Sequence, residues 1–489
     1  MVDVQPRERG RLAEPDLLVT KPYIDGKWVD GSAPPVRVDD PYTLEVFSEV
    51  AAVGPGEARA AIDAAAQALP GWAAKTARER GGVLRRWYDL LIKHRNDIAT
   101  LITRENGKTL REAQGEVDYA AGYVEFYAEE ATRSIGETIP SPVPGRRLFV
   151  EREPIGVCAV ITPWNFPLAM LARKVAPALA AGCTVVARPS DLTPVTALAF
   201  AKLGEEAGVP PGVLNVVIGK SRPIGEVLTS SPIVRKLSFT GSTEVGALLA
   251  AACAPTIKRL SLELGGNAPL IIFDDADIDV AIETAMVAKF RNGGQSCVAA
   301  NRIYVQRGIL DRFLSAFGDK VRNMKAGDGF DSTCDIGPLI DEDAVEKVEQ
   351  HREDAIARGA YCVAGGPSPG GRLSIPTLIA GAPPDALFTR EETFGPLAGV
   401  IAFDTFEEGI RMANDTPYGL ASYICSSDPA TIARASRALE FGMVGINTGV
   451  ISTPVAPFGG VKMSGYGREG SSHGLLEYQN LKYVCHAGL

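Results

Sequence analysis

A single cysteine stands where nucleophilic chemistry is possible. Cys297 follows a polar, glycine-bearing turn at 291–296 and precedes the apolar run 303–305, which is typical of a strand. Residues 280–290 have helical spacing, so the turn lies at the end of an element, where reactive groups are held exposed but fixed. Glycines at 293 and 294 would let backbone N–H groups approach a bound atom. The alternative is a buried structural thiol, the commoner state of a lone cysteine.

A carboxylate with apolar neighbours is a candidate base. Glu263 lies between Leu262 and Leu264, and two glycines follow. Partial desolvation would raise the pKa of Glu263 and make it a better base near neutral pH. The alternative is a glutamate at a strand end that pairs with a lysine.

Two segments could bind a nucleotide, although the dinucleotide fingerprint GxGxxG is missing. Residues 239–246 run from a predicted strand into a predicted helix, whose first N–H groups could face a pyrophosphate. No Lys-Ser/Thr pair follows the second glycine, which disfavours a nucleotide-hydrolysing P-loop. Arg188 and Asp191 follow a predicted strand and could hold a ribose. For residues 239–246 the alternative is a structural turn. For Arg188 and Asp191 it is a solvated loop in which Asp191 caps the following helix.

The elements that would position these residues alternate regularly after residue 155. Apolar runs predict strands at 156–161, 184–187, 213–218, 235–239 and 259–262. Helical spacing separates them at 167–181, 194–207, 222–229 and 243–253. This alternation is typical of an α/β fold with a parallel, Rossmann-type sheet that binds ligands at the carboxyl ends of its strands. A second α/β pattern runs from residue 269 to about 455 and contains Cys297.

The remaining segments complete the predicted organisation. A hairpin is expected at 23–29, helices at 56–69, 76–104 and 110–133, and an extended crossing segment at the proline-rich 139–145. Runs at 147–151 and 481–484 suggest strand edges that pair in an oligomer. The expected units are a polar tail (1–20), a dinucleotide-binding domain (21–133 and 155–263), a catalytic domain (264–455) and a small β oligomerisation extension (134–154 and 470–489).

Composition narrows the class of protein. A net charge of −9 argues against nucleic acid or an anionic membrane as a partner. The eight cysteines and four histidines are scattered, so neither a metal site nor a disulfide framework is expected. No apolar run is long enough to span a membrane, and the N-terminus lacks an apolar signal segment. We therefore expect a cytoplasmic enzyme or binding protein.

Six short motifs occur in one order along the chain. They are Pro-Trp-Asn-Phe-Pro at 163–167, Phe-Thr-Gly-Ser at 239–242, Glu-Leu-Gly-Gly at 263–266, Gly-Gln-Ser-Cys at 294–297, Glu-Thr-Phe-Gly-Pro at 392–396 and Pro-Phe-Gly-Gly at 457–460. Together they resemble the aldehyde dehydrogenase superfamily from residue 22 to the end of the chain.

The resemblance implies roles for five catalytic residues. Cys297 would attack the aldehyde carbon, giving a thiohemiacetal and then a thioester. The side-chain amide of Asn165 and the backbone N–H of Cys297 would hold the oxyanion. Glu263 would activate water, Lys174 would lie near the oxyanion and cofactor, and Glu469 would assist proton movement. Lys174, hydrogen-bond donors and Glu263 would together activate the thiol without a histidine.

The resemblance also implies NAD or NADP as cofactor, and no metal. The implied cofactor-binding residues are Thr162, Trp164, Arg188, Ser190, Asp191, Gly241, Ser242, Leu264, Glu392 and Phe394. Arg188 stands where the family usually has lysine and suits a 2′-phosphate, whereas Asp191 would repel one. The 2′-phosphate of NADP could hardly avoid repulsion by the fixed carboxylate of Asp191, so NAD is favoured.

Three further residues resemble the succinate-semialdehyde dehydrogenase branch of the family. Arg173, Arg291 and Ser452 would grip the distal carboxylate of the substrate, since guanidinium groups bind carboxylates with two hydrogen bonds. The tail at 482–489 is also similar to that branch, and a homodimer or homotetramer is expected. Ala299 stands where some members have a second cysteine, so a redox-switch disulfide there is not expected.

Several alternatives stay open from the sequence. The substrate could be glutarate semialdehyde or an uncharged or cationic aldehyde, in which case both arginines would be structural. A CoA-acylating enzyme is disfavoured, because the base Glu263 would activate water in competition with CoA. A catalytically silent structural protein on this fold is disfavoured by the joint presence of Cys297, Glu263 and Asn165.

Overall fold

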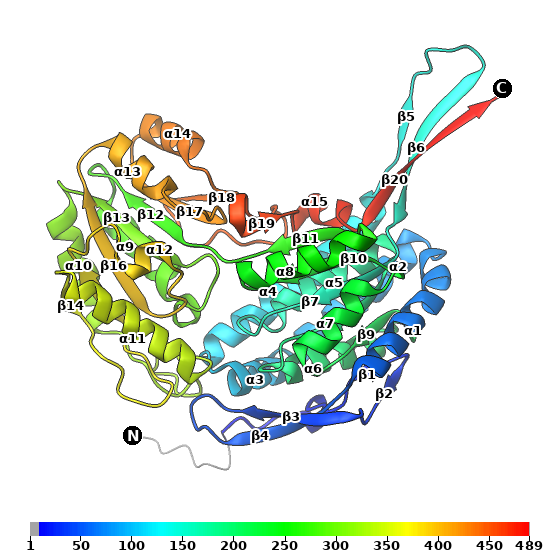
Figure 1. Ribbon diagram of the computed structural model, residues 1–489, viewed down its shortest axis with the longest axis horizontal. Helices are drawn as coiled ribbons and strands as arrows, with labels where there is room; N and C mark the ends of the chain where they lie inside the picture. Colours follow the sequence, from blue (N-terminus) through cyan, green and yellow to red (C-terminus); the bar gives the residue numbers. More distant parts are fainter. Residues whose placement is uncertain (1–8, 489) are drawn as a thin grey trace.

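The computed structural model describes residues 9–488, which form two α/β bodies and a projecting arm (Figure 1). One body contains an eight-stranded sheet whose five central strands are parallel. Across the sheet the strands are β19 (Gly465–Tyr466), β11 (Arg259–Glu263), β10 (Val234–Thr240), β7 (Val157–Ile161), β8 (Thr184–Arg188), β9 (Leu214–Val216), β1 (Tyr23–Ile24) and β2 (Lys27–Trp28). This sheet is the Rossmann-type sheet that the sequence predicts.

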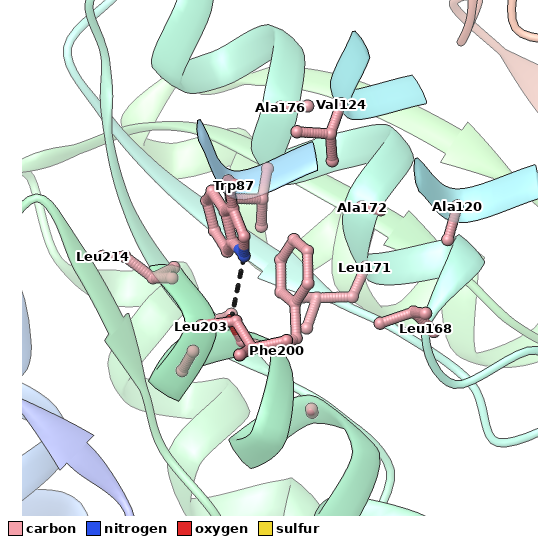
Figure 2. Close-up of a cluster of buried hydrophobic side chains, with 14 of the residues drawn as sticks. Trp87, Ala120, Val124, Leu168, Leu171, Ala172, Ala176, Phe200, Leu203 and Leu214 are labelled. Carbon is pink, nitrogen blue, oxygen red and sulfur yellow. Dashed lines mark hydrogen bonds between the residues drawn. The ribbon is translucent and has the colours of Figure 1, made fainter. Parts of the chain in front are cut away.

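Helices cover both faces of this sheet. Those that pack on its strands are α1 (Pro55–Ala73), α5 (Ala169–Ala181), α6 (Pro194–Glu206) and α7 (Ser221–Ser230), and α8 (Thr243–Cys253) lies against α7. An outer layer packs on α5 and α6 and consists of α2 (Ala77–Lys93), α3 (Arg95–Asn106) and α4 (Leu110–Glu130). The strands β7 and β8 are buried along their whole length, as expected for a parallel sheet covered on both faces. Between α2 and α6, Trp87 stacks on Phe200 with ring centroids 4.2 Å apart, and its indole N–H donates to the Phe200 carbonyl (Figure 2).

The second body is built on a seven-stranded sheet that is parallel except at one edge. Its order is β14 (Tyr361–Ala364), β15 (Thr377–Ala380), β16 (Leu397–Phe403), β13 (Ala300–Gln306), β12 (Ala268–Ile272), β17 (Ala421–Cys425) and β18 (Met443–Ile446). The helices of this body are α9 (Ile278–Phe290), α10 (Leu310–Arg322), α11 (Glu342–Ala357), α12 (Leu387–Arg390), α13 (Phe406–Asn414) and α14 (Pro429–Ala438). The predicted second α/β pattern is therefore confirmed.

A three-stranded antiparallel sheet projects from the first body as an arm (Figure 1). It consists of β20 (Gln479–Ala487), β6 (Arg146–Pro154) and β5 (Glu137–Ile139), and the short α15 (Ser471–Leu476) precedes β20. The proline-rich residues 140–145 form the turn between β5 and β6 at the tip of the arm. The predicted crossing segment is thus wrong, because β6 folds back on β5 instead of leading to another body.

Two further expectations differ from the structure. The predicted helix 76–104 is two helices, because His94 leaves the helical conformation (φ −100°, ψ 20°) between α2 and α3. Of the predicted polar tail, residues 1–8 lie outside the described part, but residues 9–20 pack against the protein. Leu17 is buried in the 3₁₀ turn Pro15–Leu17, and Arg9 pairs with Asp328 and Asp40. An apolar leucine and a doubly paired arginine hold this segment in place.

The remaining elements are short. A two-stranded antiparallel sheet is formed by β3 (Ala33–Asp39) and β4 (Val46–Ala52). Other 3₁₀ turns are η2 (Ala131–Arg133), η3 (Ala254–Thr256), η4 (Arg291–Gly294) and η5 (Lys462–Ser464). None of the helices within residues 9–488 has the length and apolar character required to cross a membrane.

Candidate active site

The loop that carries Cys297 has an unusual backbone. It begins at η4, where Asn292, Gly293 and Gly294 have positive φ angles of 54°, 60° and 76°. Asparagine and glycine are the residues that adopt this left-handed conformation at least cost. A Cβ atom at Gly294 would lie 2.3 Å from the carbonyl oxygen of Gly395. That glycine therefore permits the turn and its packing on a neighbouring loop.

Cys297 lies in the wall of a cavity of about 350 Å³ between the two bodies. The cavity is located at the carboxyl ends of β7, β10 and β11, where a parallel sheet of this kind binds ligands. Predicted site residues make up much of its wall, namely Trp164, Asn165, Gly241, Ser242, Leu264, Glu392 and Phe394. The thiol is half-buried, so it is not the sealed structural thiol of the alternative interpretation.

Asn165 is tied to the Cys297 loop through its side chain and its backbone. The Asn165 Nδ2 donates to the carbonyl oxygen of Gln295 at 3.0 Å, and Asn292 Nδ2 donates to the carbonyl oxygen of Asn165 at 2.9 Å. Because an amide nitrogen carries two N–H groups, one of them stays available to a ligand. The arrangement can present a hydrogen-bond donor next to the sulfur.

The thiol of Cys297 is strongly desolvated. Burial raises its pKa to about 12, and the negative charges of Glu392 and Glu263 act in the same direction. Arg173 is the cation that lowers this pKa. The sequence assigned that effect to Lys174, whose Nζ instead pairs with Glu469 and donates to Ser238 Oγ at 3.1 Å. Lys174 is held by these partners, and Arg173 is the cation that acts on the thiol.

Glu263 is a buried carboxylate without a partner. Its residue is 1% exposed, and neither carboxylate oxygen has a hydrogen-bond partner among the described residues. Burial raises its pKa well above the usual range, and the neighbouring charge of Glu469 raises it further. The prediction of a desolvated glutamate is confirmed, and the alternative of a lysine-paired strand end is wrong. Such a group accepts a proton near neutral pH.

Glu469 gathers two consecutive cations of α5. Its carboxylate pairs with both Arg173 and Lys174, and all three side chains are buried. Burial alone would raise the pKa of Glu469, but these two cations offset it and hold the pKa below its usual value. Burial lowers the pKa of Lys174. The cluster is therefore a charged network directly behind Glu263.

The two arginines predicted to bind substrate lie on a patch of aromatic rings. The guanidinium carbon of Arg173 lies 4.4 Å from the ring centre of Phe458, and that of Arg291 lies 5.2 Å from the ring centre of Phe166. Tyr119 connects them, since its ring is 6.0 Å from Arg291 and its hydroxyl is 2.8 Å from that of Tyr123, which neighbours Arg173. The two guanidinium groups thus border one aromatic patch.

Ser452 is the third predicted substrate residue. It lies half-buried in the loop after β18, and the described residues provide no hydrogen bond to its hydroxyl. The loop is fastened near it, because Ser471 N donates to the carbonyl oxygen of Pro454 at 2.7 Å. The structure records no contact that joins Ser452 to either arginine.

The predicted cofactor residues of the first body form a strip along the carboxyl ends of β10, β7 and β8, which are neighbours in the sheet, and Glu392 and Phe394 face it across the cavity. Trp164 and Phe394 meet edge to face with centroids 5.6 Å apart, and Glu392 accepts a hydrogen bond from Gly266 N at 3.4 Å. Ser242 caps α8 by accepting from Val245 N at 3.3 Å, which leaves other N–H groups of the first turn free. The strip combines an aromatic clamp, a carboxylate and a helix N-terminus.

At the far end of this strip, Arg188 and Asp191 form an ion pair. Arg188 Nη2 also donates to Gly219 O at 3.0 Å and to Ser221 Oγ at 2.8 Å, whereas its buried Nε has no hydrogen-bond partner among the residues that the structure describes. Ser190 Oγ accepts from Leu192 N at 3.2 Å. The buried hydroxyl of Thr162 likewise has no partner within residues 9–488. Orphaned donors and hydroxyls beside a helix N-terminus suit a dinucleotide with its phosphates and ribose hydroxyls.

Comparison with known proteins decides the family. The profile of the aldehyde dehydrogenase family matches residues 28–484. The chain belongs to the aldehyde dehydrogenase family. Within this family it is 51% identical to a glutarate-semialdehyde dehydrogenase of Pseudomonas aeruginosa, over 98% of this chain and 100% of the relative. It is also 51% identical to an NADP(+) succinate-semialdehyde dehydrogenase of Escherichia coli, over 97% of this chain and 99% of the relative.

A solved structure of another aldehyde dehydrogenase supports the same assignment. The crystal structure of a succinate-semialdehyde dehydrogenase from Burkholderia pseudomallei superposes with a TM-score of 0.97 at 52% identity, covering 98% of this chain and 100% of that one. The fold predicted from the sequence is therefore the aldehyde dehydrogenase fold.

The sequence missed several residues of this aldehyde dehydrogenase site. Tyr119 and Tyr123 lie one helical turn apart on α4, a spacing that could have indicated a shared face. Lys289 is fully buried, its ammonium has no hydrogen-bond partner among the described residues, and burial lowers its pKa to about 7 against the opposing effect of Glu392. Burial also raises the pKa of Glu392 to about 7. No sequence signal shows that the charges of Lys289 and Glu392 act on each other, because they belong to different elements.

Proposed function

We propose that this aldehyde dehydrogenase oxidises succinate semialdehyde to succinate with NAD or NADP. The observation that carries the proposal is the pair of guanidinium groups, Arg173 and Arg291, that border one aromatic patch, of which Arg173 is close enough to Cys297 to lower its pKa. Cationic forks suit a distal carboxylate, and the apolar rings suit the short chain between that carboxylate and the aldehyde. Relatives with about half of their residues identical carry succinate- and glutarate-semialdehyde dehydrogenase names.

Glutarate semialdehyde is the second candidate, because it differs from the first by a single methylene. The same two arginines would bind either carboxylate. One methylene in an apolar site changes discrimination by about 10–200-fold. Chain length is therefore a quantitative question for a substrate panel, and both compounds belong to the proposed class of ω-carboxylated aldehydes.

The proposed reaction begins at the sulfur of Cys297. Its thiolate would attack the aldehyde carbon, while the Asn165 amide and the Cys297 N–H would hold the resulting oxyanion. A bound nicotinamide cofactor would accept the hydride from this carbon. The C–H bond is lost and a thioester remains on Cys297. Trp164, Gly241, Ser242, Leu264, Glu392 and Phe394 would hold the cofactor.

Hydrolysis of the thioester would then depend on Glu263. Its unpaired, desolvated carboxylate would take a proton from water, whose oxygen attacks the thioester carbon and releases the acid and the thiol. Glu469 lies close to Glu263, and its carboxylate would accept and pass on this proton, while Lys174 holds that carboxylate in place. The net reaction consumes aldehyde, water and oxidised cofactor and yields acid, reduced cofactor and a proton.

NAD is the proposed preference. The carboxylate of Asp191 would repel a 2′-phosphate on the ribose, and its ion pair with Arg188 occupies the guanidinium that such a phosphate would need. The Escherichia coli relative is named for NADP, so the preference rests on these two residues of this chain.

We also propose that the chain forms a homodimer or homotetramer through the arm. Ile139, Leu481 and Tyr483 are exposed there, and β5 and β20 leave two unpaired strand edges. The proposed dinucleotide-binding domain (21–133 and 155–263) and catalytic domain (264–455) contain most of the two sheets, with β19 as a later addition to the first.

A substrate panel tests the proposed function. Rates with succinate semialdehyde, glutarate semialdehyde and butanal would be measured with NAD and with NADP. We expect kcat/KM for a semialdehyde to exceed that for butanal by at least about tenfold, since a hydrogen bond to a charged group contributes about 1.5–3 kcal/mol. Equal values for the three aldehydes would reject recognition of a carboxylate.

A further inference from the structure

A buried ion pair lies directly under Asn165. Lys108 Nζ donates to Glu116 Oε2 at 2.7 Å, and neither side chain has solvent-exposed surface. The same Nζ donates to the carbonyl oxygen of Asn165 at 2.8 Å and lies 4.0 Å from the ring centre of Phe166. Lys108 therefore makes its contacts with the backbone of the predicted oxyanion residue and with the residue after it.

Glu116 extends this contact to the helix that carries Arg173 and Lys174. Its second oxygen, Oε1, accepts from Leu168 N at 2.9 Å and from Ala169 N at 3.2 Å, where α5 begins. A carboxylate at a helix N-terminus satisfies free N–H groups and complements the helix dipole. One carboxylate thus joins Lys108 to the start of α5.

Glu112 lies one turn before Glu116 on α4 and reaches the nucleophile loop. Its Oε1 accepts from Asn292 N at 2.6 Å. Asn292 Nδ2 in turn donates to the carbonyl oxygens of Asn165 at 2.9 Å and of Gln295 at 3.1 Å. A single helix face therefore holds both the segment with Asn165 and the loop with Cys297.

We propose that Lys108 and Glu116 are positioning residues for aldehyde oxidation, which fix the amide of Asn165 relative to Cys297. The proposal rests on the role of Asn165 in the proposed function. Lys108 and Asn292 donate to one carbonyl oxygen, so the backbone of Asn165 is held from two sides. Loss of Lys108 frees one side and leaves the carboxylate of Glu116 buried without its counter-charge.

A role in stability alone does not account for the choice of residues. Buried ion pairs contribute little net stability compared with apolar residues of similar volume. The Lys108–Glu116 pair reaches the backbone at Asn165, Leu168 and Ala169, and these contacts need the directional hydrogen bonds that apolar residues lack. These hydrogen bonds are what we expect of a pair that positions Asn165 and the start of α5.

The test uses Glu116→Gln and Lys108→Met in the full-length enzyme, with Glu105→Gln as the matched control. Glu105 is equally buried and accepts from Val195 N at 2.8 Å and Thr196 N at 3.0 Å, so it caps α6 as Glu116 caps α5. We expect kcat to fall at least about tenfold in Lys108→Met, as for a partly misplaced oxyanion donor. Glu105→Gln should keep the parent kcat, and cofactor affinity measured by fluorescence titration should be unchanged in all three variants.

A double-mutant cycle with Asn165→Ala separates placement from a structural effect. Removal of an oxyanion donor should lower kcat by about 10²–10³ in the parent enzyme but by much less in Lys108→Met, because there the amide is already misplaced. Multiplicative losses, or parent kcat in both Lys108→Met and Glu116→Gln, would overturn the proposal. If Lys108→Met does not fold, Glu116→Gln carries the cycle, since it keeps an acceptor oxygen for α5.

The same cycle distinguishes failure of this proposal from failure of the proposed function. If Asn165→Ala itself keeps the parent kcat, the oxyanion role of Asn165 is wrong and the positioning role falls with it. If Asn165→Ala lowers kcat but the losses multiply, the proposed function stands and only the positioning role is wrong.

Discussion

The guanidinium of Arg173 pairs with the carboxylate of Glu469 in the interior of the protein, where the two residues are 1% and 3% exposed. Arg291, in contrast, is half-buried, and its guanidinium lies over the rings of Tyr119 and Phe166 with no ion pair to any described residue. The two arginines predicted to bind the substrate carboxylate are therefore not equivalent. Arg291 is free to bind substrate, whereas Arg173 also belongs to the charge network of Glu263 and Cys297.

This difference predicts different kinetics for the two arginine variants. Arg291→Met should raise KM for succinate semialdehyde by at least about tenfold, the effect of losing a charged hydrogen bond, and should leave butanal oxidation unchanged. Arg173→Met should lower kcat for both aldehydes, because Glu469 loses a counter-charge and the Cys297 thiol loses the cation that lowers its pKa. Steady-state kinetics with both substrates is the measurement. Equal losses on butanal in the two variants would contradict the assignment.

The charge of Glu469 should set the pH dependence of thioester hydrolysis. Glu469 raises the pKa of Glu263, and a base works only when deprotonated, so activity rises as pH passes that pKa. Glu469→Gln should therefore move the acid limb of the kcat–pH profile to lower pH, by on the order of one unit for a lost neighbouring charge. Arg468→Gln is the matched control, since Arg468 lowers the same pKa and its loss should move the limb upward. If the acid limb moves in the same direction in Glu469→Gln and in Arg468→Gln, this coupling is refuted.

The thiol of Cys297 should be mostly protonated in the free enzyme. With a pKa of about 12, its thiolate fraction grows about tenfold per pH unit between pH 7 and pH 9. Alkylation by iodoacetamide should increase in the same proportion without a plateau in that range. Cys297→Ala provides the background from exposed thiols such as Cys362 and Cys485. A plateau below pH 9 would mean that another group activates the sulfur before substrate binds.

Cofactor preference should respond to the charge at position 191. Asp191→Ser removes the carboxylate that pairs with Arg188 and frees the guanidinium for a 2′-phosphate. The ratio of kcat/KM for NADP to that for NAD should increase at least about tenfold, as expected for a new charged hydrogen bond. Asp191→Asn removes the charge but keeps the length of the side chain, so it separates these two effects of Asp191→Ser. An unchanged ratio in both variants would show that the pair does not select the cofactor.

The sequence predicted the two sheets well, because their strands are short apolar runs that are buried on both faces. The predicted strand 156–161 is β7 (Val157–Ile161), and the predicted helix 243–253 is α8 (Thr243–Cys253). The break at His94 was not predicted, since the helical spacing of apolar residues continues across it. The local pattern of apolar residues predicts whether a segment is a helix or a strand better than it predicts whether that element is unbroken.

The candidate site was predictable only in its separate parts. Residue type and neighbours indicated Cys297 and the desolvation of Glu263, and the resemblance to the aldehyde dehydrogenase family is confirmed. Partners that are distant in the chain were not predictable, because packing alone brings them together. Lys174 meets Glu469 across 295 positions, and Lys108 meets Asn165 across 57. A lysine or a glutamate in a sequence carries no sign of such a partner.

The central claim is that the sulfur of Cys297 carries the acyl group, and direct detection of that group tests it. The enzyme would be mixed with succinate semialdehyde and NAD, quenched in acid during turnover, digested and analysed by mass spectrometry. We expect one succinyl group on the peptide that contains Cys297, and neither the adduct nor cofactor reduction in Cys297→Ala. Cofactor reduction at the parent rate in Cys297→Ala, or an acyl group on another residue, would contradict it.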